Sequence, residues 1–213
     1  MTLRQRAYRE IKNKIIYFEL RAGEKILESK ISQSLGLGRV PVREALAMLE
    51  SERLLTKAKG YGYVVTKLAN EEIGDFLKIR SALEKIGAEM LIERITDQEI
   101  RKIGRHVERA KEVYNCGDLK KIIQSDTIFH DLLYRATKSE AYYQTISSLL
   151  DKTIIMRAAA MQSKTGREAS LHDHEQIYRA IEQRDLALLQ KLIGEHLKFA
   201  PAYYESIGPL LFA

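Results

Sequence analysis

Apolar residues in the first part of the chain recur every three or four positions, which predicts three short helices around a small core. The spacing breaks at Ala22-Gly23-Glu24, where the first helix is expected to have ended, and further helices are expected at about 28–35 and 40–52. The residues expected on the buried sides are Tyr8, Ile11, Ile15 and Phe18, then Ile31 and Leu35, then Val42, Leu46 and Leu49.

A β-hairpin is predicted directly after the third helix. Two short apolar runs, 54–57 and 63–66, flank the segment Ala58-Lys59-Gly60-Tyr61-Gly62, whose glycines suit a tight tip. Three helices followed by such a hairpin form a winged helix-turn-helix. The glycines would let the tip approach a nucleic-acid duplex closely while Lys59 meets a phosphate. The alternative is a solvated hairpin tip.

The corner between the second and third helices has the residues that a DNA-reading helix requires. Gly36 can supply the left-handed backbone of a tight corner, and Pro41 fits the first turn of the next helix. Arg39 and Arg43 then project from the leading end of that helix, where a guanidinium can pair with guanine O6 and N7 or clamp a phosphate. The alternative is a helical hairpin with solvated arginines.

From Asn70 onward no proline interrupts the chain until Pro201, and the apolar spacing is that of an all-helical bundle. Capping residues are present at the expected helix starts, including Thr96 with Glu99 as a capping box. The other expected caps are Asp118, Ser139 and Asp185, and the expected helices span 70–94, 97–116, 119–137, 140–162, 168–184 and 186–205. The chain is therefore expected to be mainly α, with a winged helix-turn-helix over 1–68 and an antiparallel all-helical bundle of six to seven helices over 69–213.

Charge separates the two parts. Residues 1–68 hold 14 Lys and Arg against 7 Asp and Glu, whereas residues 69–213 hold 21 against 22, so the whole basic excess lies in the first third. This predicts a polyanionic partner for the first part only. No apolar run reaches the roughly 20 residues of a membrane span, and the N-terminus lacks the apolar core of a signal peptide, so a cytoplasmic protein is expected. Cys116 is the only cysteine, which excludes an intrachain disulfide and a thiolate metal cluster.

A second group of candidate residues lies in the helical part. Asp126 and His130 are four residues apart, so their side chains share one helix face with Cβ atoms about 6 Å apart. His174 and His196 fall in the fifth and sixth helices, and an antiparallel bundle could direct all four side chains to one point. Three imidazoles and a carboxylate suit zinc, nickel or another divalent transition metal. The alternative is a set of hydrogen-bonded core histidines.

Two arginines are candidates for binding a ligand carboxylate. Arg80 falls among apolar positions of the first bundle helix, and Arg157 lies near the end of the fourth. A surface arginine, or one paired with Glu84, is the alternative for Arg80.

At these positions the sequence resembles the GntR family of bacterial transcription regulators, in the FadR-like branch with an all-helical FCD effector domain. The run from Gly36 to Leu46 is close to the family's Gly-Val-Ser-Arg-Thr-Pro-Val-Arg-Glu-Ala-Leu, and Asp126, His130, His174 and His196 match the metal ligands of the metal-binding FCD subgroup in type and order. The resemblance implies operator contacts at Arg39, Arg43, Lys59, Gly60, Tyr61 and Gly62. It also implies a divalent metal (zinc, with nickel or manganese as alternatives), a small organic acid that completes its coordination, and a dimer on a palindromic operator.

The chain departs from the family pattern at three places. Gly38 and Val40 stand where the family often has Ser and Thr, and Arg53 stands where it usually has Gly in the turn before the wing. The first two departures remove hydroxyls that could contact phosphate or cap the helix, which alters the details of operator contact.

The expected function is a homodimeric, ligand-responsive transcription regulator, a repressor rather than an activator, and not an enzyme. One alternative is a metal sensor in which the cation itself is the signal. Another is a metal-dependent hydrolase, with Glu175 or Glu195 as the base. Neighbouring residues in a helix point about 100° apart, so neither glutamate is well placed for that role.

Overall fold

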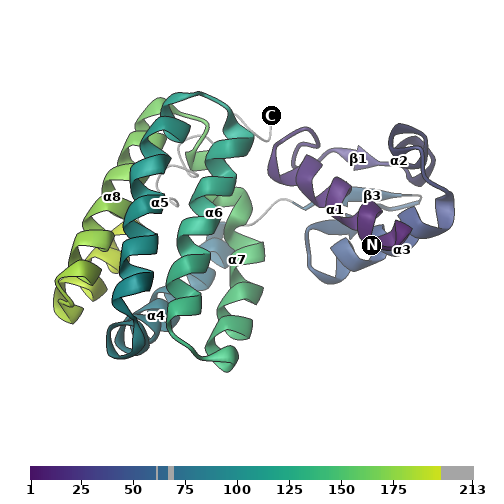
Figure 1. The fold of residues 1–213 in the computed structure, drawn as a ribbon. Coiled ribbons are helices and arrows are strands. Elements are labelled where there is room, and N and C mark those ends of the chain that lie inside the picture. Colours follow the sequence, from purple (N-terminus) through teal and green to yellow (C-terminus); the bar gives the residue numbers. More distant parts are fainter. Residues whose placement is uncertain (61, 67–69, 198–213) are drawn as a thin grey trace. The chain divides into compact units, whose positions relative to one another are not determined.

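The computed structural model describes residues 1–60, 62–66 and 70–197 (Figure 1). These residues form two compact units, an N-terminal unit within residues 1–69 and a helical unit that begins at Asn70. The expected boundary between residues 68 and 69, and the expected end of the last helix at 205, lie outside the described residues.

Three helices form the core of the N-terminal unit: α1 (Leu3–Ile16), α2 (Glu28–Leu35) and α3 (Arg39–Ser51). α1 begins at a capping box between Thr2 and Gln5. Its buried residues pack against those of α3, and the fully buried members are Ala7, Ile11, Val42, Ala45, Leu46 and Leu49. Tyr8 and Leu35 are only half-buried.

The first helix is shorter than the apolar spacing indicated. It ends at Ile16, and Phe18 adopts a left-handed backbone with φ 60°, so the prediction that Phe18 continues the buried side of this helix is wrong. The Tyr17 N–H donates to the Asn13 carbonyl and the Leu20 N–H donates to the Lys14 carbonyl, which closes the helix before Phe18.

A three-stranded antiparallel sheet completes the N-terminal unit, with strands β1 (Lys25–Ile26), β2 (Leu55–Lys57) and β3 (Tyr63–Val65) in the order β1-β3-β2. The predicted hairpin is β2 and β3, where Leu55 pairs with Val65 and Lys57 with Tyr63. β1 was not predicted, because two residues are too few to show a strand's alternation. Its Ile26 is buried and pairs with Tyr63.

Two turns of this unit have left-handed backbone. Gly36 has φ 62° and ends α2, which confirms the predicted corner. Arg53 has φ 61° in the turn between α3 and β2. A residue with a Cβ is strained in this region, which explains why the resembling family usually has glycine there.

The helical unit contains α4 (Asn70–Arg94), α5 (Asp97–Asn115), α6 (Leu119–Ala136), α7 (Glu140–Ala160), α8 (Lys164–Glu182) and helical residues 186–197. Thr96, Asp118, Ser139 and Asp185 accept backbone N–H groups as predicted, and Thr96 with Glu99 forms the capping box. α8 begins four residues before the predicted 168. Ser163 accepts the Gly166 N–H, so that glycine lies in the first turn.

The helices pack around one apolar core. α5 lies alongside both α6 and α8, and α4 packs against α6 and α7 (Figure 1). Buried core members include Ile103, Phe129, Leu133, Ile146, Ile177 and Leu189. No described helix has both the length and the apolarity needed to span a membrane. The predicted fold class, a helix-turn-helix followed by a helical bundle, is confirmed.

Candidate nucleic-acid interface and candidate metal centre

The two predicted DNA-reading arginines lie on the first five residues of α3, and both are exposed. Arg39 is the first residue of the helix, and Pro41 lies within its first turn. The Arg43 side chain is 65% exposed, and its Nε and Nη2 each donate to a carboxylate oxygen of Glu28 at 2.9 Å. This hydrogen-bonded ion pair lowers the pKa of Glu28, whose side chain is only 10% exposed. Sequence reasoning did not identify Glu28, because no local pattern connects it with Arg43.

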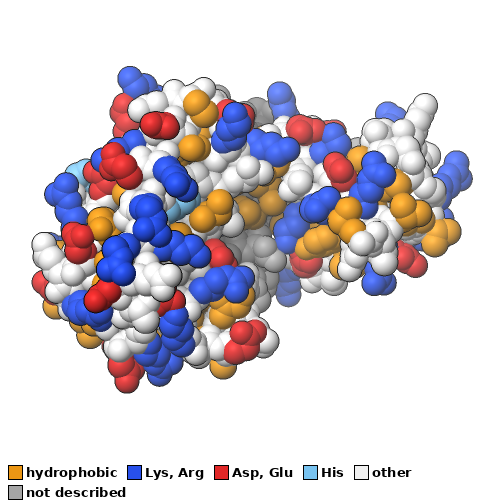
Figure 2. Space-filling view, in the orientation of Figure 1, with side chains coloured by type: hydrophobic (Ala, Val, Ile, Leu, Met, Phe, Trp, Pro, Cys, Tyr) orange, Lys and Arg blue, Asp and Glu red, His pale blue; other side chains and the backbone are white. Residues whose placement is uncertain are grey.

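The predicted wing tip lies beside this helix. Gly60 and Gly62 have φ 100° and 92°, a backbone that favours glycine, whereas Tyr61 lies outside the described residues. A surface hollow separates the wing from α3, and the residues that line it are Glu28, Arg43, Lys57, Ala58, Gly60, Gly62 and Tyr63. Figure 2 shows lysine and arginine side chains on the drawn face of this unit among fewer acidic ones. An exposed helix start and an adjacent wing are the parts that a winged helix-turn-helix presents to DNA.

The four predicted metal ligands meet in the interior of the helical unit. The ligand nitrogens of His130 (α6), His174 (α8) and His196 (helical residues 186–197) all lie within 4.8 Å of one another. Asp126 Oδ1 lies 3.7 Å from His174 Nε2 and 4.0 Å from His130 Nε2. Asp126, His130 and His174 are each no more than 2% exposed. The bundle thus brings residues from three helices to one point.

The atoms that face this point lack hydrogen-bond partners. Asp126 Oδ1, His130 Nε2 and His174 Nε2 are buried and have none among the described residues. Hydrogen-bonded core histidines would not leave these atoms unpaired, because an unpaired buried polar atom costs about 1–3 kcal/mol. Burial also lowers the pKa of His130 and His174 well below the ordinary value, since it penalises the protonated ring. Both rings are therefore neutral at neutral pH, which is the form that binds a metal.

Hydrogen bonds on the other ring nitrogens orient two of the imidazoles. His196 Nδ1 lies 3.0 Å from Asp173 Oδ2, and His130 Nδ1 lies 3.4 Å from the Tyr134 hydroxyl. Each contact occupies Nδ1 and leaves Nε2 for the cluster, an arrangement typical of metal-ligating histidines. Neither Asp173 nor Tyr134 was predicted. Asp173 directly precedes the candidate ligand His174, and this position was the one sequence signal that could have pointed to it.

Both candidate arginines are buried. Arg157 Nη1 donates to Asp126 Oδ2 at 2.5 Å, and Arg80 Nε donates to Glu84 Oε1 at 2.6 Å. Arg80 is 1% exposed, so the surface alternative is wrong and the pairing with Glu84 is confirmed. The Tyr134 hydroxyl also donates to Glu84 Oε1, which connects Arg80 to His130.

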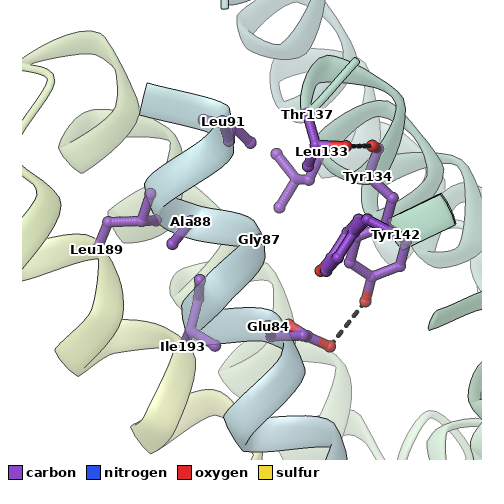
Figure 3. A pocket seen from close by; sticks show the side chains of 10 residues that line it. All are labelled: Glu84, Gly87, Ala88, Leu91, Leu133, Tyr134, Thr137, Tyr142, Leu189 and Ile193. Atoms are coloured by element: carbon purple, nitrogen blue, oxygen red, sulfur yellow. Dashed lines mark hydrogen bonds between the residues drawn. The ribbon is translucent and has the colours of Figure 1, made fainter. Parts of the chain in front are cut away.

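A small cavity adjoins this network (Figure 3). Its walls are mostly apolar, with Glu84 and the Tyr134 hydroxyl at one end, and none of the histidines lines it. The Tyr142 ring packs directly on Gly87, where a Cβ would come within 3 Å of the ring. Glu175, the base of the hydrolase alternative, has an oxygen 3.5 Å from Lys111 Nζ.

Comparison with known proteins agrees with both units. The model described as "Bacterial regulatory proteins, gntR family" matches residues 3–65, and the FCD domain model matches residues 75–199. The chain is 25% identical over 190 residues to the uncharacterized HTH-type transcriptional regulator YdhC of Bacillus subtilis, covering 89% of this chain and 85% of that protein. It is 24% identical over 192 residues to the gluconate operon transcriptional repressor of Bacillus licheniformis, covering 88% and 79% respectively.

Solved structures share the fold. Escherichia coli McbR/YncC superposes with a TM-score of 0.82 at 19% identity, covering 97% of this chain and 99% of that one. A putative GntR regulator from Rhodococcus sp. RHA1 superposes with a TM-score of 0.79 at 20% identity, covering 95% and 97%. With a gntR-type helix-turn-helix followed by an FCD domain, the chain belongs to the GntR family and is a DNA-binding transcription regulator of the FadR-like arrangement.

Proposed function

We propose that this regulator is a homodimer whose binding to a palindromic operator is controlled by a small organic acid at a divalent metal site in the helical unit. The observation that carries the proposal is the set of unpaired, buried ligand atoms, Asp126 Oδ1, His130 Nε2 and His174 Nε2, which lie next to His196. A divalent cation would satisfy all of them at once.

The residues fit a transition metal. Asp126, His130, His174 and His196 would hold it, and three imidazoles with one carboxylate favour zinc, with nickel or manganese as alternatives. Arg157 holds the second oxygen of Asp126, and Asp173 holds His196, so both ligands are oriented before a metal arrives. The metal would supply a Lewis-acidic centre at which a carboxylate can bind.

The N-terminal unit would carry the output. Arg39 and Arg43 would contact the major groove, while the wing around Lys59, Gly60, Tyr61 and Gly62 contacts the adjacent backbone. A dimer places two such units on half-sites about one helical turn apart, and the acid would act by changing their spacing. The name of the Bacillus licheniformis relative, a gluconate operon transcriptional repressor, supports repression rather than activation.

The first test measures metal content and mass. Elemental analysis of the purified full chain should find one divalent transition metal per chain, and light scattering should give about twice the 24.5 kDa of one chain. His174→Ala should lose the metal, whereas His172→Ala, an exposed residue of the same helix, should retain it. Full metal content in both Asp126→Ala and His174→Ala would contradict the site.

The second test measures affinity for an operator fragment selected from genomic DNA with the protein itself. Fluorescence anisotropy compares three samples: protein treated with a chelator, protein loaded with zinc, and zinc-loaded protein to which a small carboxylic acid has been added. We expect the acid to change operator affinity only when the metal is present. A full response to zinc alone would instead make the cation the signal, as in the metal-sensor alternative.

A further inference from the structure

We infer that the controlling acid is a dianion with two separate carboxylate groups, one held at the metal beside Arg157 and the other held by Arg80. The inference rests on the proposed metal site and specifies the chemical class of its ligand. It follows from two observations about buried groups around the histidines.

The first observation is that a metal alone would leave part of the site unsatisfied. Among the described residues, the buried side-chain atoms without partners include two guanidinium nitrogens, Arg80 Nη2 and Arg157 Nε. A cation cannot pair with an N–H donor, so these atoms require an acceptor. Carboxylate oxygens form charge-assisted hydrogen bonds with guanidinium groups, which are stronger than those of neutral acceptors.

The two arginines reach the cluster through different residues. Arg157 contacts Asp126, so it lies next to the coordination sphere itself. Arg80 is connected through Glu84 and Tyr134 to the far nitrogen of His130. A ligand with two carboxylates could therefore serve both arginines, one carboxylate at the metal beside Arg157 and the other at Arg80.

The second observation is the charge of the interior. The buried charged side chains described in the helical unit are Arg80, Glu84, Asp126 and Arg157, and they sum to zero. Asp173, which contacts His196, is 30% exposed, so solvent screens its charge and it is not counted among the buried charges. A divalent metal with neutral imidazoles would leave two uncompensated positive charges. Because burying net charge is costly, a ligand with two negative charges fits and a monocarboxylate leaves one charge unbalanced.

The test compares acids of equal chain length in which a methyl group replaces the second carboxylate. Zinc-loaded full chain is titrated calorimetrically with malate against 2-hydroxybutyrate, succinate against butyrate, and glutarate against valerate. At least one diacid should bind about tenfold or more tightly than its partner, because the second carboxylate forms a charge-assisted hydrogen bond with a guanidinium. Equal affinities in all pairs would overturn the inference, and this comparison requires no variant to fold.

Variants locate the second carboxylate. Arg80→Met combined with Glu84→Gln removes the guanidinium without leaving Glu84 as an unpaired buried carboxylate, and it should abolish the preference for the diacid. Arg135→Met, at an exposed arginine of α6, should preserve it. Circular dichroism and metal content establish that each variant is folded and loaded. A preference that survives in the folded double variant would overturn the role of Arg80.

The inference and the proposed function can fail separately. If zinc binds and monoacids release the operator as well as diacids do, the proposed function stands and the inference is wrong. If no metal binds to the wild-type chain, both are wrong.

Discussion

The guanidinium of Arg43 is held by Glu28 through two parallel hydrogen bonds, from Nε and from Nη2, each 2.9 Å long. This pair joins α3 to the start of α2 and engages the side of the guanidinium that carries Nε. Neither of these two bonds uses Nη1, and an arginine fork can pair with O6 and N7 of guanine. Glu28 therefore orients the side chain that we expect to read the operator.

Glu28→Gln should lower the ratio of specific to non-specific DNA affinity by about fivefold or more, because a neutral amide holds the guanidinium less firmly. Fluorescence anisotropy with operator and unrelated duplexes measures the ratio. Glu44→Gln removes the same charge from an exposed position of α3 and should leave the ratio unchanged. An equal loss in both variants would mean that charge alone, and not orientation, is responsible.

Arg43→Ala should weaken operator binding by about 1–3 kcal/mol while the fold is retained, because it removes one arginine contact to a base or phosphate. The measurement is an operator titration at constant salt, with circular dichroism as the control for folding. Unchanged affinity would remove Arg43 from the residues that read the operator.

The Glu28–Arg43 pair should make stability depend on pH in the acid range. The pKa of Glu28 lies below its ordinary value of 4.5, mainly because Arg43 donates to the carboxylate. The stabilisation is therefore complete above 4.5 and is lost as the pH falls below it, where the unfolded chain takes up the proton first. The difference in thermal midpoint between wild type and Glu28→Gln should shrink over this range. A difference that is constant with pH would contradict the assignment.

Gly62→Ala should destabilise the N-terminal unit more than Gly60→Ala. Both positions have a left-handed backbone, which costs a residue with a Cβ roughly 1–2 kcal/mol. A Cβ on Gly62 would also lie 2.5 Å from the Ile26 carbonyl oxygen. A Cβ on Gly60 would have no such neighbour within 4 Å. We expect an additional cost of about 1–3 kcal/mol for Gly62→Ala in urea denaturation. Equal costs would show that β1 moves to accommodate the methyl group.

Asp173→Asn should weaken zinc binding about 10- to 100-fold, because the carboxylate next to His196 Nδ1 fixes the orientation and tautomer of the ring. Competition with a chromophoric chelator measures the affinity. Glu175→Gln, on the other side of His174, serves as the control and should have little effect, since Glu175 contacts Lys111. Unchanged affinity in Asp173→Asn would exclude a positioning role for this residue.

Most helices of this protein were predictable because their signals are local. A cap such as Thr96 with Glu99 lies within one turn, and the apolar residues of α3 recur at the spacing that one helix face requires. The boundaries that differed, at Phe18 and Ser163, depend on which backbone groups close a helix end. Periodicity does not record that choice.

The candidate metal ligands were also predictable by type, since Asp126 and His130 share one face of a single helix. Their convergence with His174 and His196 could only be hypothesised, because it depends on the rotation of each helix about its axis. Packing sets that rotation, and it involves contacts distributed over the whole core.

The amino-acid order thus establishes where helices start, which faces are apolar and which residues could bind DNA or a metal. The tertiary structure alone decides the partners of those residues: Glu28 for Arg43, 15 positions away, and Asp173 for His196, 23 positions away. It also decides that Arg80 and Arg157 are buried with unpaired nitrogens. The physical reason is that hydrogen bonds within a turn are specified by neighbouring residues, whereas partners from different helices meet only after the apolar faces have packed.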